Sequence, residues 1–251
     1  MTEHIQVTID GVEVRVPQGT SILDAAKEAG IDIPILCYTE HTTANGLCRL
    51  CMVEVEGGGM QAACVTEARD GAVIHTNTED VRRARRVNLE MLASAVDLSE
   101  APEILEMMEE YDCHPERFGE VPKVPGDKID DNPVYVRDYA KCVMCWRCVQ
   151  VCAEDAQYSY ALNFKGRGFN TRITTFFEKP LTETTCVFCG QCVGTCPTGA
   201  LKGKREYLLE QGIAPEKVFE MTKVEGRELR SLRGPHLDGL EMMESGDNGS
   251  G

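Results

Sequence analysis

Two runs of four cysteines, both spaced C-x2-C-x2-C-x3-C, constrain this chain more than any other feature of its sequence. The runs are Cys142, Cys145, Cys148 and Cys152, and then Cys186, Cys189, Cys192 and Cys196, with Pro197 directly after the second. Three thiolates this close together can surround three corners of a cubane, while the fourth falls on the helix that follows. The spacing therefore predicts two [4Fe–4S] clusters.

The spacing also predicts how the eight thiolates divide between the clusters. In bacterial-type two-cluster ferredoxins, the fourth cysteine of each run ligates the cluster of the other run. We therefore expect one cluster on Cys142, Cys145, Cys148 and Cys196, and the other on Cys152, Cys186, Cys189 and Cys192. Zinc ribbons, which also use C-x2-C pairs, are the alternative. A zinc ion takes four ligands, and the third closely spaced cysteine of each run would then have no role.

A third group of cysteines lies nearer the N-terminus. It consists of Cys37, Cys48, Cys51 and Cys64, spaced C-x10-C-x2-C-x12-C. Plant-type ferredoxins hold a [2Fe–2S] cluster with C-x4-C-x2-C and a distant fourth cysteine. This chain keeps the central C-x2-C pair, but its first gap is ten residues instead of four. The spacing predicts a [2Fe–2S] site. Four buried free thiols in a small domain are the alternative.

The segments around this group favour a β-grasp fold. Residues 5–9 and 12–16 alternate in polarity around Asp10-Gly11, which predicts a hairpin. A helix should follow, with Ser21 as its N-cap and Gly30 as its C-terminal stop. Residues 50–55 and 60–66 should add further strands. Hairpin, helix, cysteine loop and strands together describe a ferredoxin domain.

Six segments carry a wider resemblance. They are Cys37, 46–55 (GLCRLCMVEV), 63–65 (ACV), 131–142 (DNPVYVRDYAKC), 167–169 (RGF) and 186–201 (CVFCGQCVGTCPTGAL). On these segments, over about residues 3–203, the chain resembles the N-terminal iron–sulfur region of the largest peripheral-arm subunit of respiratory complex I. NAD-linked formate dehydrogenases and soluble NAD-reducing or electron-bifurcating hydrogenases share this module.

The chain departs from that family at two places. Many members carry a further cubane on H-x3-C-x2-C-x5-C, but between residues 65 and 141 this chain has only Cys113, His75 and His114. We therefore expect no such cluster and interpret Cys113 as a spare thiol in a loop. Trp146 stands where the family commonly has glycine. Its indole would shield a cluster or enter a partner's pocket, although simple packing is the interpretation we favour.

The resemblance implies one-electron transfer inside a multisubunit oxidoreductase, with no catalytic residue and no cofactor site beyond the clusters. It implies a flavin-bearing NAD(P)-reactive subunit at one end and a separate catalytic subunit, a formate dehydrogenase, hydrogenase or related enzyme, at the other. Ferredoxin is a further candidate partner. Only 55 residues follow Cys196, so we expect the catalytic machinery on other polypeptides.

Two other functions compete with this interpretation. A free-standing multi-cluster ferredoxin would be a mobile carrier and would purify alone. The iron–sulfur subunit of succinate dehydrogenase or fumarate reductase also joins a β-grasp cluster to a two-cluster domain. The ten-residue gap between Cys37 and Cys48, together with the two identical cysteine runs, speaks against that subunit.

The charge of the chain limits the classes of partner that it can bind. The formal net charge is −15, which opposes nucleic-acid binding because that needs a basic face. Residues 97–131 hold 12 acidic and 3 basic residues, which predicts either a docking surface for a basic partner or a solvated face. The sequence starts directly with a strand and has no run of 18 apolar residues, so we expect a cytoplasmic protein without membrane insertion.

These expectations combine into an α+β protein. Residues 1–78 should form the β-grasp [2Fe–2S] ferredoxin domain, 79–135 an acidic helical connector, 136–205 a bacterial-type two-[4Fe–4S] ferredoxin domain, and 206–251 a partly disordered tail. In the connector, a helix at 80–94 should bury one face and leave its four arginines mostly solvated or facing a partner. The buried face should hold Val81, Ala84, Val87, Met91 and Leu92; the arginines are Arg82, Arg83, Arg85 and Arg86. A second short helix is expected at 102–111, a strand at 171–177, and helical turns at 206–211 and 215–222.

Overall fold

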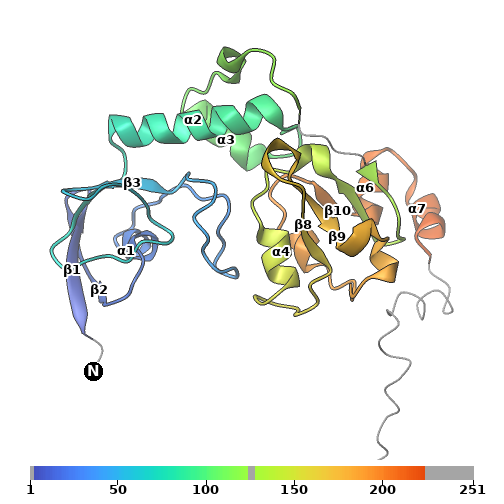
Figure 1. Ribbon diagram of the computed structural model, residues 1–251, viewed down its shortest axis with the longest axis horizontal. Helices are drawn as coiled ribbons and strands as arrows, with labels where there is room; N and C mark the ends of the chain where they lie inside the picture. The colour runs from blue at the N-terminus through green and yellow to red at the C-terminus, as the bar shows by residue number, and fades with distance from the viewer. Residues whose placement is uncertain (1–2, 124–127, 224–251) are drawn as a thin grey trace, which may run out of the picture.

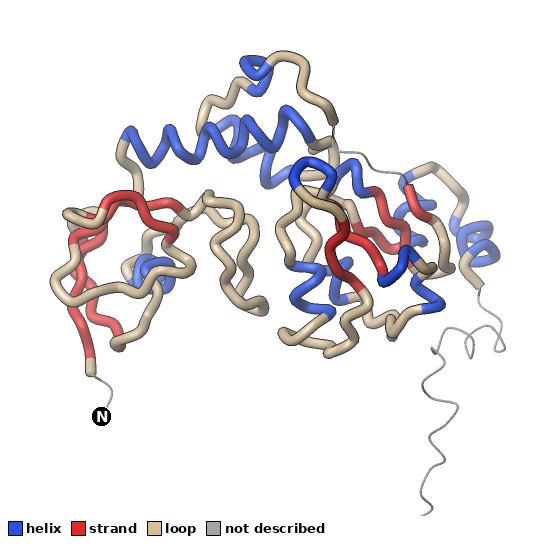
Figure 2. Tube along the Cα trace, viewed as in Figure 1, coloured by secondary structure: helices blue, strands red, loops and turns tan. Residues whose placement is uncertain are grey.

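The computed structural model of the protein describes residues 3–123 and 128–223. It has two lobes, bridged across one side by the helices α2 (Glu79–Ala95) and α3 (Pro102–Glu110) (Figure 1). Strands and helices are mixed in both lobes (Figure 2). The predicted α+β class and the two ferredoxin-like parts are confirmed.

The N-terminal lobe is a five-stranded sheet in the order β2-β1-β5-β3-β4. Its strands are β1 (His4–Ile9), β2 (Val12–Pro17), β3 (Met52–Val55), β4 (Gly59–Ala62) and β5 (Val73–His75). β5 runs parallel to β1, and the other pairs are antiparallel. The hairpin turns through Asp10 and Gly11, whose φ angles of 46° and 83° suit an Asp-Gly turn. The predicted hairpin is confirmed.

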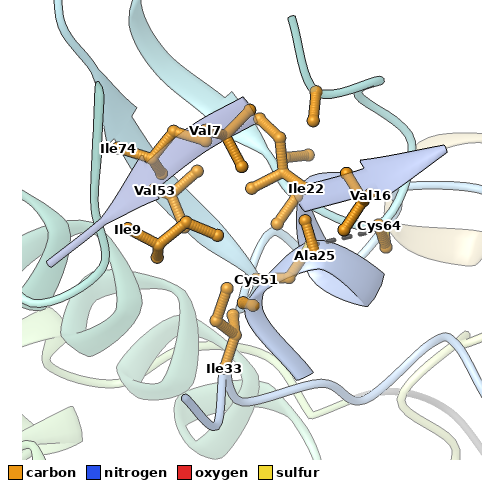
Figure 3. Packing of buried hydrophobic residues seen from close by; sticks show 14 of the residues in the cluster. Val7, Ile9, Val16, Ile22, Ala25, Ile33, Cys51, Val53, Cys64 and Ile74 are labelled. Atoms are coloured by element: carbon orange, nitrogen blue, oxygen red, sulfur yellow. Dashed lines mark hydrogen bonds between the residues drawn. The ribbon is translucent and has the colours of Figure 1, made fainter. Parts of the chain in front are cut away.

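One helix covers this sheet. In α1 (Ile22–Glu28), Ser21 is the N-cap, and its Oγ accepts a hydrogen bond of 3.0 Å from the N–H of Asp24. Apolar side chains from the inner face of the sheet meet the buried face of α1, and Cys51 and Cys64 complete the same core (Figure 3). The predicted strands at 50–55 and 60–66 are shorter than expected, because the chain turns around both cysteines.

The connector contradicts part of its predicted pattern. The buried residues of α2 are Val81, Arg85, Leu89 and Glu90, whereas Met91 is exposed. Arg85 donates to the hydroxyl of Tyr111 at 2.9 Å and to the Met52 carbonyl at 2.8 Å. The expectation that the four arginines are mostly solvated or face a partner was therefore wrong for Arg85. A guanidinium satisfies buried acceptors that the apolar periodicity cannot reveal.

Two other arginines of α2 donate hydrogen bonds to carbonyl groups at the end of α3. Arg86 Nε donates to the Tyr111 carbonyl at 2.7 Å, and Arg82 donates to the Glu110 carbonyl at 2.9 Å. Both carbonyls lie at the C-terminal end of α3, where helical carbonyl groups lack partners within the helix. The two helices are joined through these contacts, and the predicted helix at 102–111 is confirmed.

Part of the connector's acidity is neutralised within the chain. Glu100 pairs with Lys141 and Lys202, Asp130 with Lys204, and Asp131 with Arg137. These contacts join the connector to the second lobe. The acidic segment is therefore a weaker electrostatic feature than its composition suggests.

The second lobe holds a three-stranded sheet in the order β10-β7-β6 and a separate hairpin of β8 and β9. The strands are β6 (Lys128–Ile129), β7 (Tyr135–Asp138), β8 (Leu162–Lys165), β9 (Arg172–Thr175) and β10 (Leu201–Gly203). The helices are α4 (Arg147–Cys152), α5 (Gln191–Gly194), α6 (Lys204–Glu210) and α7 (Pro215–Met221). Short 3-10 turns complete the chain: η1 (Pro115–Phe118), η2 (Tyr139–Lys141), η3 (Gly168–Asn170), η4 (Phe176–Glu178) and η5 (Leu181–Glu183).

Several local predictions apply to this lobe. The strand expected at 171–177 ends at Thr175, because Phe176 and Phe177 leave the ladder in η4. The two helical turns expected after residue 205 are confirmed as α6 and α7. The disorder expected at 245–251 lies outside the described residues. Among the residues that are described, no helix is long and apolar enough to cross a bilayer.

Candidate metal centres

The first candidate site lies where the cysteine loop meets the N-terminal sheet. Cys37, Cys51 and Cys64 are buried, and Cys48 is half-buried. The sulfurs of Cys51 and Cys64 lie 3.3 Å apart (Figure 3), and Cys37 and Cys48 form a second thiol pair. The fold thus brings all four predicted cysteines to one end of the sheet, in two pairs.

Each pair contains one acidified thiol. The pKa of Cys48 is lowered because Cys37 donates a hydrogen bond to its sulfur, and Cys64 lowers the pKa of Cys51 in the same way. Backbone amide groups add to this, including that of Leu50 beside Cys48. Two buried thiol pairs with amide donors are a donor set that fits two irons with two thiolates each.

Two further cavities lie in the second lobe, and each is lined by four of the remaining predicted cysteines. The first is bordered by Cys142, Cys145, Cys148 and Cys196, and the second by Cys152, Cys186, Cys189 and Cys192. Each cavity thus receives three cysteines from one run and the fourth from the other. Figure 1 shows α4, which carries Cys152, beside the β8–β9 hairpin.

The crossing follows from the way both runs fold. Met144 and Phe188 occupy equivalent positions with φ angles of 54° and 53°. Trp146 and Gly190 are the N-caps of α4 and α5, with φ angles of 74° and 81°. Each run is therefore a left-handed turn followed by a short helix, and the two helices pack together. Cys152 is the last residue of α4, and Cys196 comes two residues after the end of α5. Each of these cysteines borders the cavity of the other run.

The chemistry of these cavities suits a cluster rather than one ion. Burial raises the pKa of Cys142 and of Cys192 to about 12, and that of Cys145 to about 11. Metal binding must therefore displace protons from these thiols. The four thiols of each set border an apolar cavity, which fits a larger group bound at several corners.

Polar groups other than thiols also face the second cavity. The N–H of Ala161 donates to Cys152 Sγ at 3.2 Å, and the N–H of Phe188 donates to Cys186 Sγ at 3.4 Å. The buried Arg137, ion-paired with Asp131, borders the same cavity. Sequence reasoning assigned no role to Arg137, although it lies within the motif at 131–142. Amide donors and a buried cation stabilise negative charge on a cluster and its thiolates.

The loop between Cys37 and Cys48 joins the first site to the second lobe. The N–H and hydroxyl of Thr43 donate to Asp155 at 2.7 and 2.8 Å, and Gln150 Nε2 donates to the Thr43 carbonyl at 2.6 Å. Farther along the loop, Asn45 Nδ2 donates to Gln150 Oε1 at 3.1 Å. The longer first gap of this cysteine group thus gives the loop enough residues to reach α4 and the turn after it, and Figure 2 shows it between the lobes.

Cys113 lies apart from these three sets. It borders neither cavity, and its sulfur is 3.8 Å from the Arg86 carbonyl. Burial raises its pKa to about 11. His114, next to it, contacts Asp112 and Glu116 instead of any predicted ligand.

Trp146 borders the first cavity and packs on Phe164 of β8, with the ring centroids 4.5 Å apart. Its ring therefore makes a packing contact and also covers one side of that cavity. The packing contact and the position beside the cavity occur together, so shielding of a bound group and simple packing are compatible roles for Trp146.

Two family models match the chain. Residues 2–79 match the 2Fe-2S iron-sulfur cluster binding domain, and residues 133–202 match the ferredoxin-like domain of NADH-quinone oxidoreductase subunit 3. The β-grasp lobe and the lobe with two cysteine cavities therefore each correspond to an iron–sulfur family.

Individual relatives agree with these matches. The chain is 40% identical to the NADP-reducing hydrogenase subunit HndD of Solidesulfovibrio fructosivorans, over 85% of this chain and 39% of that protein. It is 30% identical to the mitochondrial NADH-ubiquinone oxidoreductase 78 kDa subunit of Candida albicans, over 80% of this chain and 29% of the relative. The chain thus spans well under half the length of these curated relatives.

A solved structure has the same architecture. A chain of the NAD+-reducing [NiFe]-hydrogenase in the H2-reduced state superimposes with a TM-score of 0.72 and 27% sequence identity. The match covers 80% of this chain and 87% of that chain. The arrangement of the two lobes therefore recurs in a solved chain of similar length.

Proposed function

The chain belongs to the iron–sulfur proteins shared by NADH-quinone oxidoreductases and NAD(P)-linked hydrogenases, and we propose that it conducts single electrons through three clusters. The observation that carries the proposal is the position of three cysteine sets along one path. The loop of the first set rests on the second lobe at α4, and α4 carries a cysteine to each of the two cavities.

The proposed ligands are twelve of the thirteen cysteines. In a [2Fe–2S] cluster, Cys37 and Cys48 would bind one iron, and Cys51 and Cys64 the other. One [4Fe–4S] cluster would be bound by Cys142, Cys145, Cys148 and Cys196, and the other by Cys152, Cys186, Cys189 and Cys192. When bound, the clusters accept and release one electron at a time.

The remaining residues would set the conditions for this transfer. Burial of the thiols excludes water, and the amide groups of Ala161 and Phe188 stabilise thiolate charge in the second cavity. The buried cation of Arg137 would raise the reduction potential there, because added negative charge is stabilised beside it. No proton has to move at any of these atoms, and the role needs no acid, base or nucleophile.

The apolar core of the connector favours a particular order of sites. Cys48 of the first set and Cys145 of the first cavity both pack against this core, together with Leu50 and Val143. In the second lobe, Cys148 and Cys192 are electrostatic neighbours across the two cavities. We propose that electrons pass between the [2Fe–2S] site, the first cubane site and the second cubane site in that order, or in reverse.

The proposed partners are a flavin-bearing NAD(P)-reactive subunit and a separate catalytic subunit, such as a hydrogenase or a formate dehydrogenase. The relatives named above support a chain that works inside a larger enzyme. A reducing compartment, and hence the cytoplasm, remains our expected location, because thiolate ligands must not be oxidised to disulfides.

Anaerobic stopped-flow spectroscopy tests the proposal. The purified, reconstituted chain should show no bleaching with NAD(P)H, formate or hydrogen alone, and its clusters should become reducible by NAD(P)H once the co-purified flavin subunit is added. Fast bleaching of the chain alone would contradict the proposal. A stable monomer that exchanges electrons with many unrelated proteins, and co-purifies with none, would favour a free-standing carrier.

A further inference from the structure

Four exposed aromatic side chains and one valine of the second lobe lie on segments at or near one end of the β8–β9 hairpin. We call Tyr158, Tyr160, Phe176, Phe177 and Val187 the aromatic patch; each of these side chains is between 52% and 80% exposed. Monomeric proteins seldom leave a group of large apolar side chains this open unless the group serves an interaction.

The backbone brings these five residues together. In the β8–β9 hairpin, Leu162 pairs with Thr175, and the segments just beyond this pair carry Tyr160 on one strand and Phe176 and Phe177 on the other. Across from this end of the hairpin, Ser159 and Thr185 exchange two hydrogen bonds of 2.5 Å, from each hydroxyl to the other's carbonyl. The tyrosine segment is thereby joined to the loop that carries Val187.

The patch adjoins the second cavity. Val187 borders that cavity, and so do Ser159 and Ala161, which flank Tyr160 in the sequence. Cys189 borders it too and is an exposed cysteine, so a cluster bound there would have one thiolate at the surface, on the same cavity lining as Val187. Electrons could enter or leave at this point without crossing the protein interior.

Backbone conformation gives a second, independent indication. Tyr158, Tyr160 and Phe177 have left-handed φ angles of 51°, 53° and 54°, which bulky residues rarely adopt. The fold requires this shape near Cys152, because the N–H groups of Ser159 and Tyr160 donate to its carbonyl at 2.8 and 2.9 Å. Glycine would adopt the shape at lower cost. Phe177 packs on the ring of Phe176, with the centroids 4.3 Å apart, but both rings stay mostly exposed. Strained and exposed aromatic side chains thus recover little packing energy within this chain, so the compensation is expected from a bound partner.

Charge indicates the nature of that partner. Glu178 next to Phe177 pairs with Lys165 and Arg172, and Lys179 pairs with Glu183. These charged neighbours of the patch are paired with one another, and Glu154 is hydrogen-bonded to Tyr160. A partner held here would present a mainly apolar surface, and its binding would depend little on salt.

We propose that the aromatic patch is the docking surface for a redox protein that exchanges electrons with the group bound by Cys152, Cys186, Cys189 and Cys192. The partner presents an apolar face with its own redox centre directly beneath it. This assignment rests on the proposed function, and it places the electron-exchange contact away from the acidic connector.

The test uses the cluster-loaded chain and the flavin- or metal-containing subunit isolated from its native complex. Affinity is measured by anaerobic biolayer interferometry at low and high salt. The double variant Phe176→Ser/Phe177→Ser should weaken binding at least tenfold and slow electron exchange with the subunit. Phe219→Ser, which removes an exposed aromatic ring on α7, is the matched control and should bind like the wild type. Raising the salt concentration should lower the affinity of the wild type by less than the double substitution lowers it.

Footprinting identifies the covered surface directly. In the complex, hydroxyl-radical labelling should fall at Tyr158, Tyr160 and Phe177, and remain unchanged at Phe219. Wild-type affinity of the double variant, protection confined to residues 97–131, or a wild-type dimer that the double variant abolishes would each overturn the docking assignment. Iron and sulfide analysis with paramagnetic resonance on every variant separates the two proposals. Missing clusters would contradict the proposed function, whereas intact clusters with unchanged binding would contradict the docking surface alone.

Discussion

Trp146 and Gly190 occupy equivalent positions in two left-handed turns, with φ angles of 74° and 81°, and each is the N-cap of a cluster-site helix. Glycine adopts this conformation freely, whereas a residue with a Cβ is strained by about 1–2 kcal/mol. The tryptophan offsets part of this cost by packing on Phe164. The two cysteine runs have the same spacing and similar backbones, but they differ in the residue that covers each cavity.

Replacement of Trp146 by glycine should lower the free energy of unfolding by less than replacement by alanine does. Both variants lose the apolar burial of the indole and its aromatic contact, but only glycine relieves strain of about 1–2 kcal/mol. Trp146→Ala keeps the strain and loses the contact, so it should be less stable than Trp146→Gly. Anaerobic urea unfolding compares the variants. Equal stability of the alanine and glycine variants would show that the left-handed turn carries no cost.

Removal of the clusters should raise the fluorescence of Trp146, the only tryptophan of the chain. The indole borders the cavity of Cys142, Cys145, Cys148 and Cys196, and a cluster absorbs light in the range in which indole emits. Oxidative release of iron in the presence of a chelator should increase emission in step with the loss of visible absorbance. Emission that is unchanged after complete iron loss would contradict a cluster in this cavity.

Cluster ligation should be crossed between the cysteine runs. Cys152→Ala should damage the cluster of Cys186, Cys189 and Cys192, because Cys152 lines the same cavity as these three. Cys196→Ala should damage the cluster of Cys142, Cys145 and Cys148, because Cys196 lines their cavity. The wild type should contain about ten iron and ten acid-labile sulfide per chain, as one [2Fe–2S] and two [4Fe–4S] clusters require. Paramagnetic resonance of both reduced variants decides the pairing. Iron near fourteen, or stoichiometric zinc, would contradict the inventory.

Asp155→Asn should loosen the contact between the lobes while the clusters are retained. Asp155 accepts two hydrogen bonds from Thr43, and hydrogen bonds to a charged group contribute about 1.5–3 kcal/mol when they are well shielded. The contact is exposed, so we expect the substitution to weaken it by about 1.5 kcal/mol or less. Hydrogen exchange at residues 39–45 should quicken, and electron transfer between the lobes should slow. Asp70→Asn is the control, because Asp70 accepts from Gln6 within one lobe.

Alkylation of Cys113 by iodoacetamide should be slow at neutral pH and should accelerate as the pH approaches about 11. The thiolate is the reactive form, and burial raises the pKa of this thiol to about 11, so little thiolate is present near pH 7. Mass spectrometry of the folded, cluster-loaded protein gives the labelling rate. Cys113→Ser should keep the full iron content, and a loss of iron in this variant would make Cys113 a ligand.

Much of the fold could be predicted locally. The Asp10-Gly11 hairpin, the Ser21 cap and the connector helices follow from short-range preferences, because turn conformation and helix capping depend on residues a few positions apart. The cysteine spacings likewise determined that three thiols of each run lie around one turn. For this reason the sequence alone indicated iron–sulfur chemistry and its family.

Only the tertiary structure decided the features that depend on distant segments. The burial of Arg85 depends on acceptors at Met52 and Tyr111, which no periodicity in α2 encodes. The contact of Thr43 with Asp155 joins residues 112 positions apart. The aromatic patch exists because the β8–β9 register and the Ser159–Thr185 contact bring three separate segments together. A sequence pattern reports which residues a local element will hold, whereas packing between elements determines which of them are buried, paired or left for a partner.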